Sequence, residues 1–421
     1  MRLAPTVFGL CVALTVAPVV AADSTADRAA AVSYSQRVEA RADLTLHDIY
    51  SAALALDPRS GLPEAYRQEA MALSARADSL LAGSPALALR HQTDEAGTNR
   101  GLRESEVNVE LPLWRWGQRQ ASRDLAEAAA GYAEAHDRAL ELDIAGLVRD
   151  ALWELALAEE HRNLARRAWT SAQTLEQDVR RRVQAGDLAE ADLLLVRDET
   201  LGKLDEYLLA TTGVRHAEKR YMALSGLPQR PADFSETASS LNTIADDHPL
   251  LSEARRRVER AQADLQRTRS AGSDSPQLIV GSRRDEEAIS GITHDSIGIG
   301  LRLPFAGASH AGPAIASANN QLAEAQSAQL ALRRTLELAL FEAGHTLETL
   351  RAELELAREQ ETLAQENLRM ARIAFDLGEI DLVQRLRVQT RAYTAERTLS
   401  LRTLQLQQAV ARYNQAVGVT P

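Results

Sequence analysis

The sequence predicts a mainly α-helical protein with a membrane β-barrel, built from two copies of one unit. The Leu-Pro pair that ends at Pro112 returns as the pair that ends at Pro304, 192 residues later. Further residues match at the same offset: Gly186 with Gly378, Val196 with Val388, Tyr221 with Tyr413, and Gly226 with Gly418. A match that keeps one register over so long a stretch indicates a duplication.

Residues 1–22 have the pattern of an export signal. A positive charge precedes a largely apolar run, and small residues close the segment at Ala22. We expect cleavage after Ala22, with Ala21 as the alternative. A retained transmembrane helix is less favoured, because Pro5 and Pro18 shorten the span below the ~20 residues that a bilayer requires. The mature chain is therefore expected outside the cytoplasm.

Composition excludes several classes of protein. The only cysteine, Cys11, lies inside the signal, which excludes a disulfide, a thiolate metal site and a cysteine nucleophile. The net charge of −11 would repel nucleic acid. No later segment holds eighteen uninterrupted apolar residues, so the sequence does not predict membrane-spanning helices. Contact with a membrane would then be through a barrel.

Two β-hairpins are expected, over about 85–114 and about 276–305. In the first hairpin, Val107, Val109, Leu111 and Leu113 alternate with Glu106, Asn108 and Glu110. In the second, Ile297, Ile299, Leu301, Leu303 and Phe305 alternate with small and polar residues. Strands with one apolar and one polar face suit an outer-membrane barrel whose apolar face meets lipid. The edge of a soluble sandwich is the alternative.

Helices surround both hairpins. After two shorter helices (about 44–56 and 63–81), each hairpin leads into a long proline-free segment of roughly 100 Å. In the second copy a heptad seam runs through Leu347, Leu350, Leu354, Ala357, Glu361, Ala364, Leu368, Ala371 and Phe375. Each long helix ends at a glycine that allows the chain to reverse into a return helix.

This order of elements gives the domain prediction. The signal is followed by a first repeat at 23–226, with an extended leader to about residue 43 and a helical hairpin at about 118–225. A linker follows at 227–247. The second repeat occupies 248–421, with its helical hairpin at about 314–417. One chain offers four membrane-type strands, whereas spanning barrels close at about eight or more, so several protomers must share one barrel.

The doubled pattern resembles the TolC family of outer-membrane efflux proteins, and it is closest to the heavy-metal efflux branch. The resemblance covers 44–421 and includes the end motifs Tyr-Met-Ala-Leu-Ser-Gly at 221–226 and Tyr-Asn-Gln-Ala-Val-Gly at 413–418. It implies a homotrimer with a 12-stranded barrel in the outer membrane of a Gram-negative bacterium and an α-helical periplasmic tunnel. The chain would be the passive exit duct, without a cofactor.

The resemblance also implies partners and site residues. A periplasmic adaptor (membrane fusion) protein and an inner-membrane transporter of the RND type would dock at the helical tips. The adaptor-contact residues would be Val183, Gly186, Asp187, Leu188, Phe375, Gly378, Glu379 and Ile380, and we expect Phe375 and Ile380 to be exposed there. The periplasmic gate would involve Asp192, Gln384, Arg385 and Arg387, with Asp192 paired to Arg385 or Arg387; a solvated helix face is the alternative.

The end of each barrel strand supplies the remaining site prediction. Trp114, Trp116 and Phe305 follow the strands where aromatic girdles meet outer-membrane lipid. The nine histidines are scattered and none has the i, i+4 spacing of a metal pair. We found no nucleotide loop or nucleophile elbow, so no enzyme is expected. The competing hypothesis is a soluble periplasmic coiled-coil adaptor or scaffold protein.

Overall fold

The computed structural model describes residues 37–421, except 273, 288–289 and 306–307. The chain divides into Met1–Arg37 and Val38–Pro421, and each is a separate unit. The predicted export signal at 1–22 and most of the predicted leader lie outside the described residues. The helices and strands that the structure describes all lie in the second unit.

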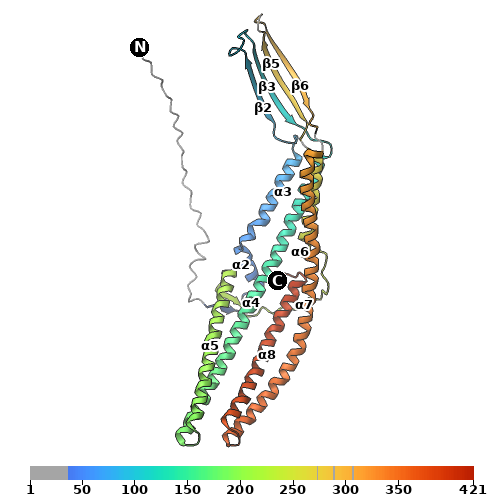
Figure 1. The fold of residues 1–421 in the computed structure, drawn as a ribbon. Coiled ribbons are helices and arrows are strands. Elements are labelled where there is room, and N and C mark those ends of the chain that lie inside the picture. Colours follow the sequence, from blue (N-terminus) through green and yellow to red (C-terminus); the bar gives the residue numbers. More distant parts are fainter. Residues whose placement is uncertain (1–36, 273, 288–289, 306–307) are drawn as a thin grey trace, which may run out of the picture. The chain divides into compact units, whose positions relative to one another are not determined.

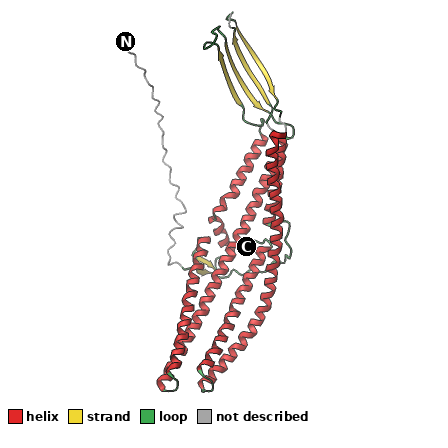
Figure 2. Cartoon of the chain, viewed as in Figure 1, coloured by secondary structure: helices red, strands yellow, loops and turns green. Residues whose placement is uncertain are grey.

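Helices dominate this unit, and the four longest strands gather in one sheet (Figures 1 and 2). In chain order the first half has β1 (Glu39–Arg41), α2 (Leu46–Leu56), η1 (Pro58–Gly61), α3 (Leu62–Asp78), β2 (Ala86–Thr93), β3 (Arg103–Pro112), α4 (Gln118–Ala185) and α5 (Glu190–Ser225). The second half has β4 (Gln229–Pro231), α6 (Pro249–Ala271), β5 (Gln277–Glu286), β6 (Thr293–Arg302), α7 (Ala308–Asp376) and α8 (Leu382–Ala416). The order of helix, hairpin, long helix and return helix thus occurs twice.

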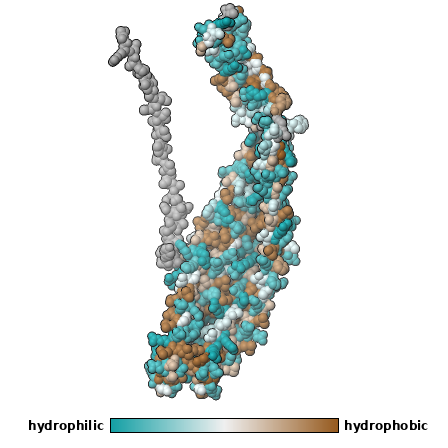
Figure 3. All heavy atoms as spheres, viewed as in Figure 1, coloured by the Kyte–Doolittle hydropathy of each residue, from teal (hydrophilic) through white to brown (hydrophobic). Residues whose placement is uncertain are grey.

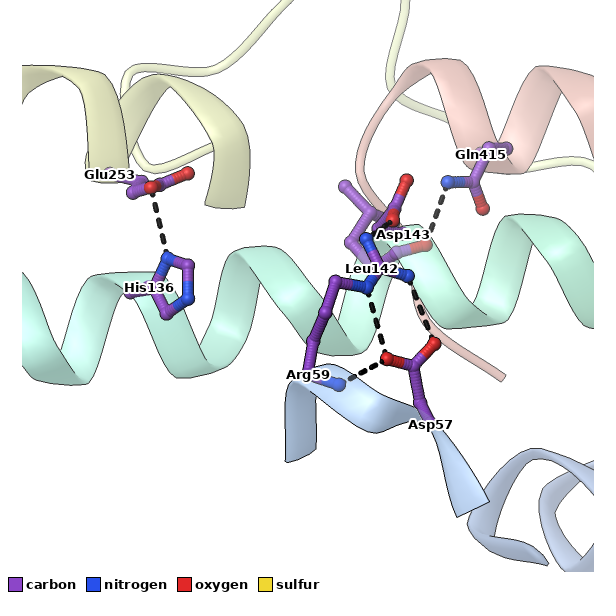
Figure 4. Close-up of polar contacts among 7 residues, drawn as sticks. All are labelled: Asp57, Arg59, His136, Leu142, Asp143, Glu253 and Gln415. Atoms are coloured by element: carbon purple, nitrogen blue, oxygen red, sulfur yellow. Dashed lines mark hydrogen bonds and ion pairs between the residues drawn. The ribbon is translucent and has the colours of Figure 1, made fainter. Parts of the chain in front are cut away.

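The long helix α4 is the element against which most others pack. It contacts α3, α5, α6 and α8, and its alanine-rich sequence lets those helices approach closely. Polar contacts fix three neighbours to it (Figure 4): Arg59 bonds Asp143 at 2.5 Å, His136 bonds Glu253 of α6 at 3.0 Å, and the Gln415 amide donates to the Leu142 carbonyl at 2.8 Å. The helix also ends as predicted, at Ala185.

The helices form two hairpins that lie side by side. α4 packs on α5, α7 packs on α8, and α4 meets α8 between the pairs (Figure 1). The predicted heptad seam of α7 is largely buried; its buried members are Leu347, Leu350, Leu354, Ala357, Leu368, Ala371 and Phe375. Burial of this stripe confirms the heptad interpretation.

The start of α7 differs from the sequence expectation. The helix begins at Ala308, six residues before the predicted start, and therefore contains Pro313. Proline at the sixth helical position removes only one backbone hydrogen bond near an end that is incompletely bonded in any case. The sequence rule that stops a helix at proline was therefore too strict here.

The four-stranded sheet has the order β2-β3-β5-β6, and all its neighbours are antiparallel. The two hairpins join through β3 and β5, in a register that pairs Val109 with Val280. β2 and β6 are the two outer strands of this sheet. The hairpins of the two halves thus form one continuous sheet.

The segment between the two halves is more ordered than a plain linker. Its first residues form β4, which pairs in parallel with β1. Farther along, Glu236 forms a bidentate ion pair with Arg149 of α4, at 2.8 and 2.7 Å. Asn414 of α8 also bonds Glu236, at 3.1 Å. The connection is therefore fixed to both helical hairpins.

Candidate functional site

The four-stranded sheet exposes its apolar face to solvent, whereas the outer strands β2 and β6 expose both faces and the central strand β3 exposes its apolar side more than its polar side. Along β3, Val107 and Val109 are exposed while Glu106, Asn108 and Glu110 are half-buried. The exposed apolar residues of the other strands and strand ends are Leu87, Leu89, Val280, Ile297, Ile299, Leu301 and Leu303. An exposed apolar area that continues across several strands marks a contact surface with an apolar medium or partner.

Register explains why this face is continuous. Leu87, Val109, Val280 and Ile299 stand opposite one another in a single row across all four strands. The other face carries charges that pair across strands: Arg283 lies 3.0 Å from Glu104, and the longer Arg302 to Glu110 pair measures 3.6 Å. The predicted polar and apolar faces are therefore both present.

The aromatic residues after the strands have different surroundings. Trp116 and Phe305 are almost fully exposed, at 102% and 94%. Trp114 is half-buried, and its indole N–H donates to the Ser79 carbonyl just beyond α3, at 3.0 Å. Trp116 and Phe305 are thus free for contact with an interface, whereas Trp114 also fixes the end of α3.

The helical tips are formed by left-handed glycines, as their sequence position predicts. Gly186 has φ 84° and Gly378 has φ 77°. After Gly186, the Asp187 N–H donates to the Arg182 carbonyl at 2.9 Å, and the Glu379 N–H bonds Ala374 at 2.8 Å in the same way. These bonds close the last helical turns, a geometry that favours glycine over residues with a Cβ atom.

The prediction that Phe375 and Ile380 are exposed is wrong. Phe375 is only 3% exposed and belongs to a buried cluster with Leu175, Val179, Val196 and Leu382. The half-buried residues that pack on this cluster are Val183, Leu188, Leu193, Ile380 and Leu386. A short reversal between two helices cannot bury its apolar side chains within one hairpin, so the two tips share one core. Among the predicted contact residues, Gly186, Asp187, Gly378 and Glu379 are exposed.

The four gate candidates do not form one group within the protomer. The Asp192 carboxylate accepts a bond from the Ala189 N–H at 3.3 Å and so caps α5. Arg385 is largely buried, 3.9 Å from Asp178, while Gln384 and Arg387 are exposed. Among residues 37–421 apart from the three gaps, no ion pair joins Asp192 to Arg385 or Arg387.

An arginine cluster beside the shared tip core was not predicted as a unit. Arg182 of α4 and Arg385 of α8 lie over the Phe375 ring, with guanidinium carbons 4.9 and 4.6 Å from its centroid. Burial, the largest cause, and the nearby charges of Arg182 and Arg372 lower the pKa of Arg385. Only Arg385 was named from the sequence, because the three helices meet through contacts between distant segments.

Two exposed apolar stripes on the helices were not predicted from the sequence. On α5, Leu194, Leu201 and Leu208 repeat every seven residues and are exposed. On and directly after α7, the exposed residues Leu356, Leu363, Met370 and Leu377 repeat in the same way. Apolar surface is visible over this part of the helices in Figure 3. Such stripes are typical of coiled-coil seams that lack their partner.

No group of three or more His, Cys, Asp or Glu side chains that could hold a metal ion is found among the residues that the structure describes. No helix in that same part of the chain is both long and apolar enough to span a bilayer.

Comparison with known proteins gives consistent results. The model of the outer membrane efflux protein family matches residues 69–227 and 241–419. The cobalt-zinc-cadmium resistance protein CzcC of Cupriavidus metallidurans is 26% identical over 315 residues, 71% of this chain and 73% of that protein.

Solved structures share the fold. The outer membrane protein VceC of Vibrio cholerae has a TM-score of 0.71 at 16% identity, and the alignment covers 89% of this chain and 96% of that one. The Campylobacter jejuni CmeC outer membrane channel has a TM-score of 0.70 at 17% identity, with 89% and 85% covered. These similarities confirm the fold class predicted from the sequence.

Proposed function

Because the chain belongs to the outer membrane efflux protein family, we infer that it is the outer-membrane channel of a tripartite efflux system. The observation that carries this function is the sheet, whose one face exposes apolar side chains in a row across four strands while the other face carries charge pairs. That polarity suits strands with lipid on one side and water on the other. The chain is a passive duct, and the energy comes from a transporter in the inner membrane.

The active form that we propose is a homotrimer. The sheet of one protomer has two outer strands, β2 and β6, and unpaired strand edges in lipid leave backbone groups unsatisfied at several kcal/mol each. Three sheets joined through these edges give a closed barrel of 12 strands. The duplicated halves, 23–226 and 248–421, would together supply the helices of the tunnel.

The unpartnered stripes support this assembly. The α5 stripe (Leu194, Leu201, Leu208) and the α7 stripe (Leu356, Leu363, Met370, Leu377) both reach twenty-two residues from their tip glycines, Gly186 and Gly378. The two stripes therefore extend equally far from the helical tips. Their chain directions are opposite, because α5 leads away from its tip and α7 leads toward its tip. An interface between two different surfaces that repeats around an axis closes a ring, so α5 of one protomer would pack on α7 of the next.

The partners that we propose are a periplasmic adaptor and an inner-membrane transporter of the RND type. The adaptor would contact the exposed part of the tips, which includes Gly186, Asp187, Gly378 and Glu379. Phe375 and Ile380 would contribute indirectly, by holding the two tips together from inside. Similarity to a cobalt-zinc-cadmium resistance protein supports heavy-metal ions as the cargo.

We further propose that Asp192, Gln384, Arg385 and Arg387 narrow the periplasmic end. Asp192 has no arginine partner in its own protomer among the described residues, so a gate pair would join two protomers. Such partly hydrated pairs are individually weak, about 0–1 kcal/mol, and a threefold ring multiplies them. We expect Asp192→Ala and Arg387→Ala to raise single-channel conductance, with Asp198→Ala on the same helix as the control; unchanged conductance in both variants would remove the gate proposal.

Membrane fractionation tests the function as a whole. The protein should be found in the outer-membrane fraction as a trimer that dissociates on heating, and it should conduct ions in planar bilayers. Deletion should raise sensitivity to cobalt, zinc or cadmium if the cargo is a heavy metal. A soluble monomer in the periplasmic fraction would refute the channel function, whereas unchanged metal sensitivity would refute only the cargo.

A further inference from the structure

Three arginines from three helices converge beside the tip core. Arg182 of α4 and Arg385 of α8 both lie within 5 Å of the Phe375 ring centroid, at 4.9 and 4.6 Å. Arg372 of α7 lines the same groove as Arg182 and Arg385. Positive charges that gather in one cluster repel each other unless negative groups lie between them.

The carboxylates nearby are too few for these cations. Asp376 bonds Arg182 at 2.7 Å. Asp178 is shared by Arg181 at 3.5 Å, Arg182 at 3.3 Å and Arg385 at 3.9 Å. The last distance is longer than a hydrogen bond, and Arg372 has no ion pair or hydrogen bond among the residues that the structure describes.

Arg385 shows the shortage most clearly. Its side chain is 13% exposed, and its Nε and Nη1 atoms are buried without a hydrogen-bond partner in the described part of the chain. Buried guanidinium nitrogens almost always have a partner, and an exception points to a missing water or ion. Both atoms belong to a residue that lines an open groove.

This groove has the size and charge of an anion site. It has a volume of about 740 Å³ and lies between α4, α7 and α8. Its charged lining consists of Arg166, Arg167, Arg181, Arg182, Arg372 and Arg385, with only Asp178 and Asp376 on the negative side. Such a concentration of positive charge is unusual in a chain with a net charge of −11.

We propose that Arg182, Arg372 and Arg385 bind a small multivalent oxyanion, one that carries several carboxylate or phosphate groups. A guanidinium presents parallel N–H donors that match pairs of carboxylate or phosphate oxygens. An oxyanion in the groove would neutralise the repulsion, and a shift of the Arg385 side chain would bring its buried Nε and Nη1 atoms to the anion. The site adds a ligand to the chain and does not rest on its role as a channel.

Occupation of the site would have a structural consequence. The three arginines belong to both helical hairpins, α4 from the first and α7 and α8 from the second. An anion bound to all three would link the hairpins near their tips. We therefore expect it to slow amide hydrogen exchange around Gly186 and Gly378.

Calorimetric titration of the full-length protein in detergent tests the site, with citrate and pyrophosphate as separate probes at matched ionic strength. Binding of citrate alone would assign a carboxylate ligand, and binding of pyrophosphate alone a phosphate ligand. Arg372 is exposed, so Arg372→Gln should fold normally. Because Arg372→Gln removes one charge-assisted bidentate contact, it should raise the dissociation constant about tenfold or more.

Arg351→Gln is the matched control, because it removes the same charge from an exposed position on α7, about 32 Å along that helix from Arg372 and outside the groove. It should leave the dissociation constant within about twofold of the wild-type value, a change that is small on the affinity scale. Three results would overturn the proposal: no heat of binding with either probe, equal weakening by both variants, or an effect that sodium chloride reproduces at the same ionic strength. The proposal would also be contradicted if the anion slowed amide hydrogen exchange at the tips of Arg372→Gln as much as in the wild type.

Discussion

Removal of Arg149 should destabilise the helical unit strongly, because this residue connects three segments from inside the fold. Its side chain is 3% exposed and that of Glu236 is 12% exposed. The guanidinium donates to both Glu236 oxygens, at 2.8 and 2.7 Å, to the Gln415 amide oxygen at 2.7 Å, and to the Val419 carbonyl at 2.9 Å. Arg149 therefore joins α4, the connecting segment and the C-terminal end.

The size of the effect follows from which charge is left behind. In Arg149→Met, the Glu236 carboxylate stays largely buried and, among the residues that the structure describes, keeps only the Asn414 amide as a partner. Removal of one member of a buried ion pair typically costs about 3–5 kcal/mol. Replacement of both members by apolar residues is often neutral or stabilising, so Arg149→Met with Glu236→Leu should recover most of the loss.

Urea denaturation of the detergent-solubilised protein, followed by circular dichroism, measures this difference. A suitable control is Arg412→Met, because the Arg412 to Asp150 pair measures 3.7 Å and both side chains are more than half exposed. An exposed pair contributes about 0–1 kcal/mol. The reasoning is refuted if Arg149→Met and Arg412→Met have the same midpoint, or if the double substitution is no more stable than Arg149→Met alone.

Two further predictions concern pH and backbone conformation. His248 is buried, and this burial lowers its pKa although the Ala416 backbone and the Asp247 charge act in the opposite direction. Because the unfolded chain then binds the proton more readily, stability should fall as the pH drops below about 6.5. His248→Phe should reduce the change in the denaturation midpoint between pH 7.5 and pH 5. A midpoint that depends on pH as strongly as in the wild type would contradict this cause. Gly378→Val should destabilise the tip by about 1–2 kcal/mol, because a left-handed conformation (φ 77°) is strained for a residue with a Cβ atom. Gly344→Ala in α7 should show no such loss in thermal unfolding, since its Cβ atom would meet only an ordinary contact at 3.7 Å.

Local patterns in the sequence were sufficient for most of the fold. The period of two along β3, the heptads of α7 and the tip glycines each depend on residues close together in the chain, and all three features are present in the structure. Burial of Phe375 depends instead on Leu175, Val179 and Val196, which lie in the other half. A tip residue could therefore be assigned to the correct turn but not to the correct environment.

The arginines illustrate the same limit for the site. Arg385 was predicted only as a possible partner of Asp192, whereas Arg182 and Arg372 join it because α4 packs on the second hairpin. The buried ion pair of Arg149 was not predictable for a similar reason, since its partner Glu236 is 87 residues away in the sequence. Charged residues are normal on helix surfaces, so only the packing shows which of them are enclosed.

If the protein assembles as the proposed trimer, the exposed surfaces of the protomer predict that trimerisation and membrane insertion are coupled. Insertion of a single protomer would place the free edges of β2 and β6 in lipid, at several kcal/mol for each unsatisfied backbone group. The stripes on α5 and α7 should therefore associate before or during insertion. We expect Leu363→Glu, at 65% exposure, to reduce both the trimer and the membrane-inserted fraction, whereas Arg358→Ala, on the same helix outside the stripe, should change neither. Normal insertion of a monomeric Leu363→Glu protein would separate the two steps and refute the coupling.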